Sequence, residues 1–170
     1  EFPIAVNPDE DGYATTWKIK VKTEADGLVY NTLSTHHKDK WANKGVKLED
    51  YVNAFKVLLT KQNGLARGAE LSGKSGASSI VGAANYYSSG NGFNEEAWSK
   101  VGIKSDASDN SLTFTLGGPT NRFYAMYYLN SSLYEPLPAE FLTDIGGIKN
   151  YGNFTTDLSR SPLDNILSVG

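Results

Sequence analysis

The chain has 170 residues, of which 39% are hydrophobic, 12% aromatic and 21% charged, and its formal net charge is -3. This length and composition are typical of one globular domain with a packed core, and they exclude a disordered chain. The charges are spread along the sequence, so we expect no nucleic-acid partner. Cysteine is absent, which excludes a disulfide framework and a thiol nucleophile.

The two ends of the sequence suggest a part of a longer precursor. No run of about 18 apolar residues occurs, so no membrane-spanning helix is expected. The start, Glu1-Phe2-Pro3-Ile4, has neither the basic residues nor the apolar stretch of a signal peptide. The last residues follow the apolar pair Ile166-Leu167 without a polar tail. We therefore expect that the precursor extends beyond this chain.

Residues 13–22 alternate between apolar and basic side chains, which is the period-two pattern of a half-buried strand. The apolar positions are Trp17, Ile19 and Val21. The intervening lysines share the other face, which is typical of a strand at the edge of a sheet. Residues 23–45 are polar and are interpreted as a long loop or a short hairpin.

Residues 48–59 form the clearest predicted helix. Their apolar side chains recur at the spacing of one buried helical face. These side chains are Leu48, Tyr51, Val52, Phe55, Leu58 and Leu59. Glu49 and Asp50 lie in the first turn, where the helix dipole favours anions, and Asn63-Gly64 is expected to end the helix. We expect this apolar face to pack on a sheet that contains Trp17.

The middle of the chain predicts short elements. Residues 64–92 are rich in glycine and serine, with one short helix at about 79–88. Residues 93–100 predict a further helix with Asn94 as its N-cap. Two strands, at 101–103 and 112–116, are joined by turn residues and predict a hairpin.

The breaker Gly117-Gly118-Pro119 is expected to end the second strand of the hairpin. Residues 120–130 then have helical spacing, and Ala139 to Ile145 predict another short helix, introduced by two prolines. This order of elements favours an α+β fold, with a mixed, antiparallel-rich sheet and packed helices, over regular βαβ winding.

The sequence gives little support to catalytic or metal chemistry. His36-His37 is the only histidine pair, and no second group of residues has the spacing of metal ligands, so we expect no metal site. A Ser-His-Asp triad has no Gly-x-Ser-x-Gly motif to support it. The stretch from Gly68 to Ser75 matches the spacing of a phosphate-binding loop, but it does not follow a buried strand. We therefore expect no catalytic residues and no cofactor.

Four aromatic rings recur at helical spacing in residues 120–130. They belong to Phe123, Tyr124, Tyr127 and Tyr128. Such rings could line a carbohydrate or peptide groove, because tyrosine combines an apolar body with a polar tip. The more ordinary interpretation is that about half of them pack in the core.

Four segments carry recognisable sequence in a fixed order. They are Asp11-Gly12 with the alternating strand at 16–22, the Lys40-Trp41 segment leading into the helix at 49–55, the hairpin at 101–116, and the aromatic stretch from Phe123 that ends in Leu133-Tyr134-Glu135-Pro136-Leu137-Pro138. Together they resemble the first lobe of the family 5 extracellular solute-binding proteins, the oligopeptide- and dipeptide-binding receptors of ABC importers. The resemblance covers nearly the whole chain.

The resemblance implies a subdomain of the type II periplasmic-binding-protein-like fold. Residues 1–170 would be a single domain, the outer part of the first lobe, and the second lobe would lie outside this chain. The expected partners are a peptide ligand, held together with that second lobe, and the membrane subunits of an ABC importer. The expected location is extracytoplasmic, at the cell surface or in the periplasm, with a lipid anchor on the full-length protein.

The resemblance also nominates a binding loop, because in the family the loop after the long helix approaches the ligand. The corresponding residues are Gly76, Ala77, Ser78, Ser79, Ile80 and Gly82, acting through backbone groups. An ordinary mobile loop is the competing interpretation. The alternative function is a standalone aromatic-rich carbohydrate-binding or adhesive surface module. An enzyme is not expected.

Overall fold

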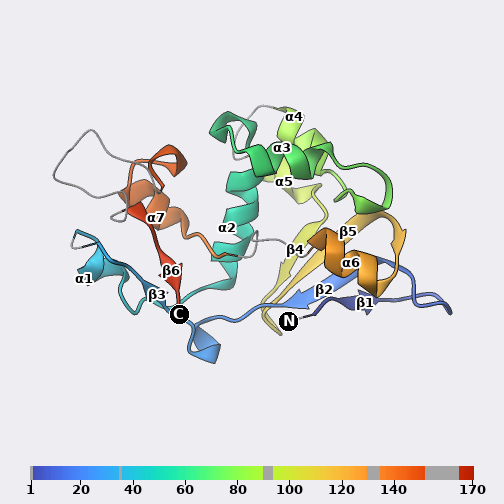
Figure 1. Cartoon of the computed structure of the whole chain (residues 1–170), viewed down its shortest axis with the longest axis horizontal. Helices are drawn as coiled ribbons and strands as arrows, with labels where there is room; N and C mark the ends of the chain where they lie inside the picture. Colours follow the sequence, from blue (N-terminus) through green and yellow to red (C-terminus); the bar gives the residue numbers. More distant parts are fainter. Residues whose placement is uncertain (1, 35, 90–93, 130–134, 152–164) are drawn as a thin grey trace. The chain divides into compact units, whose positions relative to one another are not determined.

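The computed structural model describes residues 2–34, 36–89, 94–129, 135–151 and 165–170 (Figure 1). Packing divides the chain into two units. One consists of Glu1–Val21 and Phe55–Tyr134, and the other of Lys22–Ala54 and Glu135–Gly170. Among the described residues, no helix is both long and apolar enough to cross a membrane.

A four-stranded antiparallel sheet in the order β1-β2-β5-β4 forms the base of the first unit. Its strands are β1 (Ile4–Val6), β2 (Ala14–Lys20), β4 (Ile103–Asp106) and β5 (Ser111–Thr120). Trp17 of β2 and Ile103 of β4 both pair with Phe114 of β5, and all three side chains are buried. The predicted strand at 13–22 and the predicted hairpin are thus confirmed.

The prediction that the strand at 13–22 lies at a sheet edge is wrong. Strand β2 is an inner strand, with β1 on one side and β5 on the other. Its central lysine, Lys18, has carboxylate partners in the hairpin turn, with Nζ at 3.0 Å from Asp109 and 3.5 Å from Asp106. The charge of Lys18 is thus paired with carboxylates at and beside the hairpin turn, although the lysine lies on an inner strand. A lysine in the alternating pattern therefore does not mark an edge.

The prediction that Gly117-Gly118-Pro119 ends the strand is also wrong. Strand β5 continues to Thr120, which pairs with Ala14 after a shift of register between Ala14 and Thr16. An irregularity of this kind accommodates glycine and proline within a strand.

Among the described residues, five helices belong wholly or partly to the first unit. They are α2 (Leu48–Leu59), which spans the boundary between the units, α3 (Ala66–Gly73), α4 (Ala83–Ser89), α5 (Glu95–Ser99) and α6 (Arg122–Leu129). The bounds predicted for α2 are confirmed, and Phe55 packs on Phe114 with ring centroids 5.4 Å apart. Asn94 caps α5, since its side chain accepts a hydrogen bond from the Ala97 N–H.

Helix α3 was not expected in the glycine- and serine-rich region. It packs so closely on α2 that a Cβ at Gly68 would overlap the Leu58 carbonyl oxygen. The matched phosphate-loop spacing from Gly68 to Ser75 therefore begins inside a helix, which is the wrong geometry for a loop that cradles phosphates.

The described part of the second unit contains a two-stranded sheet, two helices and the first part of α2. Strand β3 (Tyr30–Asn31) pairs with β6 (Ser168–Val169), and the helices are α1 (Lys38–Trp41) and α7 (Ala139–Asp144). Residues 23–45 are thus neither one long loop nor a simple hairpin. The predicted helix after Pro138 is confirmed.

Aromatic rings hold this unit together. Trp41 packs edge-on against Tyr30 and Phe141, with ring centroids 6.1 and 5.4 Å apart. The Trp41 indole N–H also donates to Asp144 at 2.8 Å, which joins α1 to α7. Short 3-10 turns complete the described chain at Glu24–Asp26, Lys61–Asn63, Gly76–Ser78 and Ile148–Asn150.

Candidate functional site

The nominated loop lies against the end of strand β5. It consists of the 3-10 turn Gly76–Ser78 followed by an extended piece in which Ile80 forms a β-bridge with Leu116. Gly117 and Gly118 approach the turn so closely that a Cβ at Gly117 would overlap the Ser79 hydroxyl and the Gly76 carbonyl oxygen. The two glycines therefore allow the loop to seat directly on the strand.

Much of the loop's backbone forms hydrogen bonds with other backbone groups of the protein. The Ser79 carbonyl accepts from the Gly117 N–H at 2.9 Å, and the Val81 N–H donates to the Thr115 carbonyl at 3.0 Å. The Val81 carbonyl in turn accepts from the Gly102 N–H at 2.8 Å. These bonds fix the extended piece as an addition to the sheet. In the turn itself, the Gly76 carbonyl accepts from the Ser79 N–H at 3.1 Å. Peptide binding by the backbone of the nominated loop stays a prediction.

A second candidate surface is the aromatic face of α6, by which we mean Phe123, Tyr124, Tyr127 and Tyr128. Phe123 and Tyr127 are 71% and 73% exposed, and Tyr124 is 49% exposed. The interpretation that half of the rings pack in the core is therefore wrong. Ala125 and Leu129 form the buried side of the helix instead, one turn apart and opposite the exposed rings.

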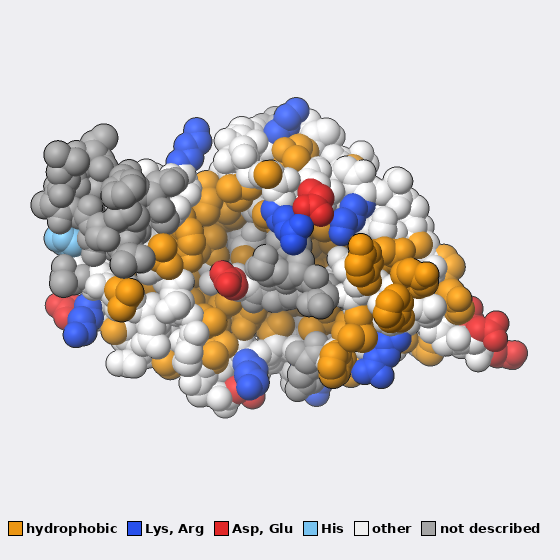
Figure 2. Space-filling model, in the orientation of Figure 1, with side chains coloured by type: hydrophobic (Ala, Val, Ile, Leu, Met, Phe, Trp, Pro, Cys, Tyr) orange, Lys and Arg blue, Asp and Glu red, His pale blue; other side chains and the backbone are white. Residues whose placement is uncertain are grey.

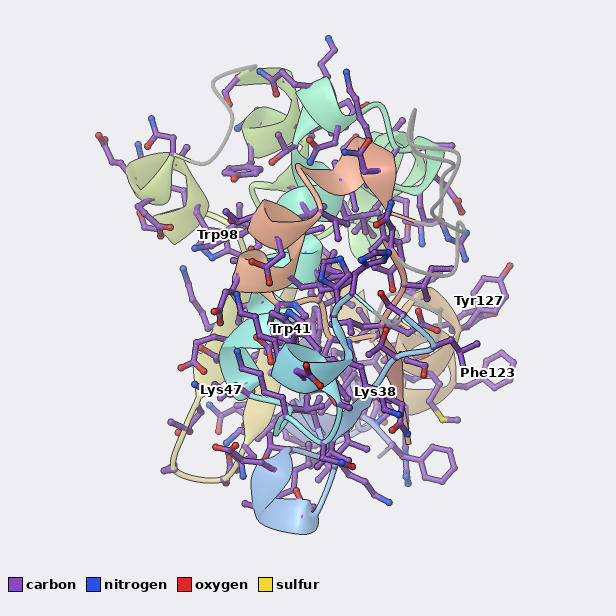
Figure 3. The ribbon with its side chains drawn as sticks, turned by 90° about the vertical axis from the view of Figure 1, so that its left-hand side faces the viewer. Lys38, Trp41, Lys47, Trp98, Phe123 and Tyr127 are labelled. Atoms are coloured by element: carbon purple, nitrogen blue, oxygen red, sulfur yellow. The ribbon has the colours of Figure 1, made fainter. Side chains whose placement is uncertain are left out.

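The rings of this face support one another. Tyr124 and Tyr128 stack with centroids 5.9 Å apart and planes 24° apart, and Tyr127 meets Tyr128 at 5.8 Å. Phe123 contacts Tyr124 edge-on at 5.4 Å. Figure 3 shows the rings of Phe123 and Tyr127 pointing the same way, outward from the helix. In Figure 2 hydrophobic side chains gather on the surface over α6.

A cation adjoins the aromatic face. Arg122, the first residue of α6, lies over the ring of Phe2 with its guanidinium carbon 5.6 Å from the centroid. Phe2 is itself 63% exposed, so the apolar surface extends beyond the helix. The helix begins two residues after β5 ends, and the nominated loop packs on that end of β5.

The histidines take no part in such a site. His36 is exposed, and His37 packs edge-on against Phe141 at 5.6 Å. Among the residues that the structure describes, no group of three or more His, Cys, Asp or Glu side chains could hold a metal ion.

A shifted carboxylate lies in the second unit, where it has a structural explanation. Burial raises the pKa of Asp50 and that of Tyr30, whose hydroxyl donates to Asp50 at 3.0 Å. Asp50 also accepts from the Lys47 N–H at 2.8 Å, at the start of α2. The pair therefore secures the N-terminus of a helix, where unpaired N–H groups need an acceptor.

Comparison with known proteins tests the fold. No family model and no curated protein sequence matches the chain. Among solved structures, the chain is similar to one described as Listeria monocytogenes OppA bound to peptide, with a TM-score of 0.59 and 18% sequence identity. The match covers 98% of this chain. The fold is that of a periplasmic-binding-protein fragment.

The predicted α+β fold class, with its antiparallel sheet and packed helices, is thereby confirmed. The match covers 25% of the other chain, so this chain spans about a quarter of that length. At this identity the similarity concerns the fold. It agrees with the resemblance to family 5 solute-binding proteins, and it does not test the nominated loop.

Sequence reasoning missed the exposure of the aromatic face although a signal was present. Ala125 and Leu129 are spaced one turn apart, and they form the buried side of the helix without an aromatic ring. The double glycine at 117–118 indicated that another segment approaches the strand closely. The sequence did not show that this segment is the nominated loop. The aromatic match at Leu133 and Tyr134 lies outside the described residues.

Proposed function

We propose that this chain is part of an extracytoplasmic peptide-binding receptor that delivers oligopeptides to an ABC importer. The observation that carries the proposal is the similarity of fold over 98% of the chain to a structure described as an OppA bound to peptide. The order of four sequence segments supports the same family independently. The proposed role is binding, without catalysis.

The proposed mechanism is closure of two lobes around an extended peptide. Residues 1–170 would form the outer part of the first lobe, and the second lobe would lie in the remaining part of the receptor. A peptide gains affinity from burial between lobes and from main-chain hydrogen bonds, and one lobe supplies only part of each. The importer's membrane subunits and a lipid anchor belong to the same proposal.

Within this chain, the proposed ligand contacts come from the turn Gly76–Ser78. Gly76 is exposed and Ala77 and Ser78 are half-buried, and the rest of the nominated segment, from Ser79 to Gly82, positions the turn on β5. The similarity of fold to a structure described as bound to peptide favours a peptide-binding receptor over a standalone carbohydrate-binding or adhesive module.

The test is a binding screen of the complete gene product with a mixed pool of peptides, alongside a panel of polysaccharides. Binding of peptides, with no binding of polysaccharides, is the expected result. Retention of polysaccharides by the 170-residue chain alone, with no retention of peptides by the complete protein, would contradict the proposal and favour the module.

A further inference from the structure

A hydrogen-bonded cap closes the C-terminal end of helix α2. The last carbonyl groups of a helix have no partner within the helix and need donors from elsewhere. The Thr60 hydroxyl donates to the Lys56 carbonyl at 2.7 Å, and the Asn63 side-chain amide donates to the Val57 carbonyl at 2.7 Å. Asn63 thus holds the end of α2 through the N–H of its carboxamide.

The residue after Asn63 makes this cap chemically labile. The carboxamide carbon of an asparagine is open to attack by the backbone nitrogen of the next residue, which is one reason why asparagine is thermolabile. A glycine at that position leaves its nitrogen unhindered, because it has no side chain. Gly64 is exposed, and nothing beyond its chain neighbours lies within 4 Å of the place that a Cβ would take. The surroundings of Gly64 therefore leave room for the attack.

We propose that Asn63 is a site of spontaneous deamidation and that the reaction releases the cap of α2. The Gly64 nitrogen loses its proton to solvent and forms a bond with the Asn63 side-chain carbon, while the bond to the side-chain nitrogen breaks and ammonia leaves. Water then opens the cyclic imide to an aspartate or an isoaspartate at position 63. In sum, a carboxamide and water become a carboxylate and an ammonium ion.

The cap itself sets the rate of this reaction. The attacking Gly64 N–H donates to the Lys61 carbonyl at 3.0 Å, and the departing Asn63 nitrogen is bonded to the Val57 carbonyl. Both hydrogen bonds must open before the ring can close. They lie in a short 3-10 turn just after a helix end, where local opening costs least. Two hydrogen bonds of ordinary strength slow the reaction by about 10- to 100-fold relative to the unfolded chain.

The product cannot restore the cap. A carboxylate has no N–H, so the Val57 carbonyl loses its side-chain donor. The new negative charge also lies at the C-terminal end of a helix, where the helix dipole disfavours anions. Val57 and Leu59 in the last turn of α2 are 3% and 0% exposed, so loosening this turn disturbs the core of the first unit. Deamidation at Asn63 is thus an irreversible change that weakens the fold.

The first test measures the reaction in the 170-residue chain, incubated at mildly alkaline pH with and without guanidinium chloride. Peptide mapping by mass spectrometry follows conversion at position 63, and enzymatic methylation of isoaspartate identifies the rearranged product. Conversion is expected in the folded chain, about 10- to 100-fold more slowly than in the denatured chain. Asn63→Gln is the chemical control and should not convert on this timescale, because its longer side chain would have to close a larger ring.

The second test measures the consequence for the fold. Asn63→Asp reproduces the charged product and should lower the melting temperature by about 3 °C, as expected for the loss of one hydrogen bond. Asn85→Asp is the matched control, because it introduces the same charge at an exposed position of α4. It should leave the melting temperature unchanged.

Three results would overturn the inference. Equal rates in the folded and denatured chain would show that the cap does not hold Asn63. No conversion in the folded chain after about a hundred half-times of the denatured reaction would show that the site is closed. An unchanged melting temperature for Asn63→Asp would reject the release of the cap. None of these measurements involves a ligand, so their outcome is independent of the proposed function.

Discussion

Two phenylalanines of this chain differ in what they contribute to stability. Phe55 is 2% exposed and packs on Phe114, whereas Phe123 is mostly exposed to solvent. Truncating a buried phenylalanine removes its burial and leaves a cavity. We predict that Phe55→Ala lowers the free energy of unfolding by about 3 to 5 kcal/mol.

The matched control is Phe123→Ala, which makes the same chemical change at the surface and should cost less than about 0.5 kcal/mol. Urea unfolding of the 170-residue chain, followed by circular dichroism, measures both. A loss of under about 1 kcal/mol for Phe55→Ala would show that α2 does not pack on the sheet as described.

Two glycines predict opposite responses to alanine. Gly82 has a φ of 73°, and a Cβ there would overlap the Lys100 carbonyl oxygen. Gly82→Ala should therefore destabilise the protein by at least about 1 kcal/mol. Gly73 ends helix α3, and nothing beyond its chain neighbours and the backbone of its own helix lies within 4 Å of the place that a Cβ would take. Gly73→Ala should therefore be neutral or slightly stabilising. Equal melting temperatures for the two variants would contradict the close packing of Gly82 on the Lys100–Val101 backbone.

At the scale of elements, helices α1 and α7 are joined by one carboxylate. Asp144 accepts hydrogen bonds from Lys40 and from the Trp41 indole, each at 2.8 Å. Burial of Asp144 alone would raise its pKa, but the hydrogen bonds from Lys40 and Trp41 outweigh burial and hold the pKa below its usual range. The contribution of Asp144 is thus fully present above the ordinary aspartate pKa of about 3.9, and it is lost as pH falls through the lower folded-state value.

We predict that Asp144→Asn lowers the free energy of unfolding by about 1 kcal/mol at neutral pH. The difference from the unaltered chain should shrink as the pH falls from the ordinary aspartate pKa through the lower folded-state pKa, because the carboxylate is neutralised first in the unfolded state and then in both states. Asp39→Asn, at an exposed position of α1, is the control and should have little effect. Urea midpoints at several pH values give the comparison, and a constant difference at all pH values would contradict the assigned role of Asp144.

The elements that could be predicted from the sequence are those whose signal is local. Helix α2 has a complete amphipathic repeat, and the hairpin of β4 and β5 has alternation on both sides of a turn. Helix α3 and the end of β5 could not be predicted, because their glycines suit loops locally. Contacts distant in sequence decide their structure, such as Gly68 on Leu58 and Gly117 on Ser79.

The candidate site was predictable to a smaller extent. The loop at 76–82 came from a resemblance to a family, and the sequence could not show that Ser79 and Val81 pair with β5. The aromatic residues of α6 were recognised as candidates for binding, yet their exposure depends on which side of the helix packs against the rest of the protein. Burial of that kind is a tertiary property, and the short helix has too few residues to specify it alone.

At the scale of the whole molecule, we propose that this chain is one part of a receptor that needs a second lobe to hold its ligand. The chain spans about a quarter of the length of the peptide-bound structure that it resembles. One lobe of such a receptor can bury only part of an extended peptide. The entropy lost by immobilising the peptide is nevertheless the same, so little net affinity remains.

Isothermal titration calorimetry with a random hexapeptide pool tests this central claim most directly, using the 170-residue chain and the complete gene product side by side. The complete protein is predicted to bind with micromolar or tighter affinity, while the 170-residue chain gives no measurable heat of binding. Micromolar binding by the 170-residue chain alone would contradict the account and indicate a self-sufficient binding module.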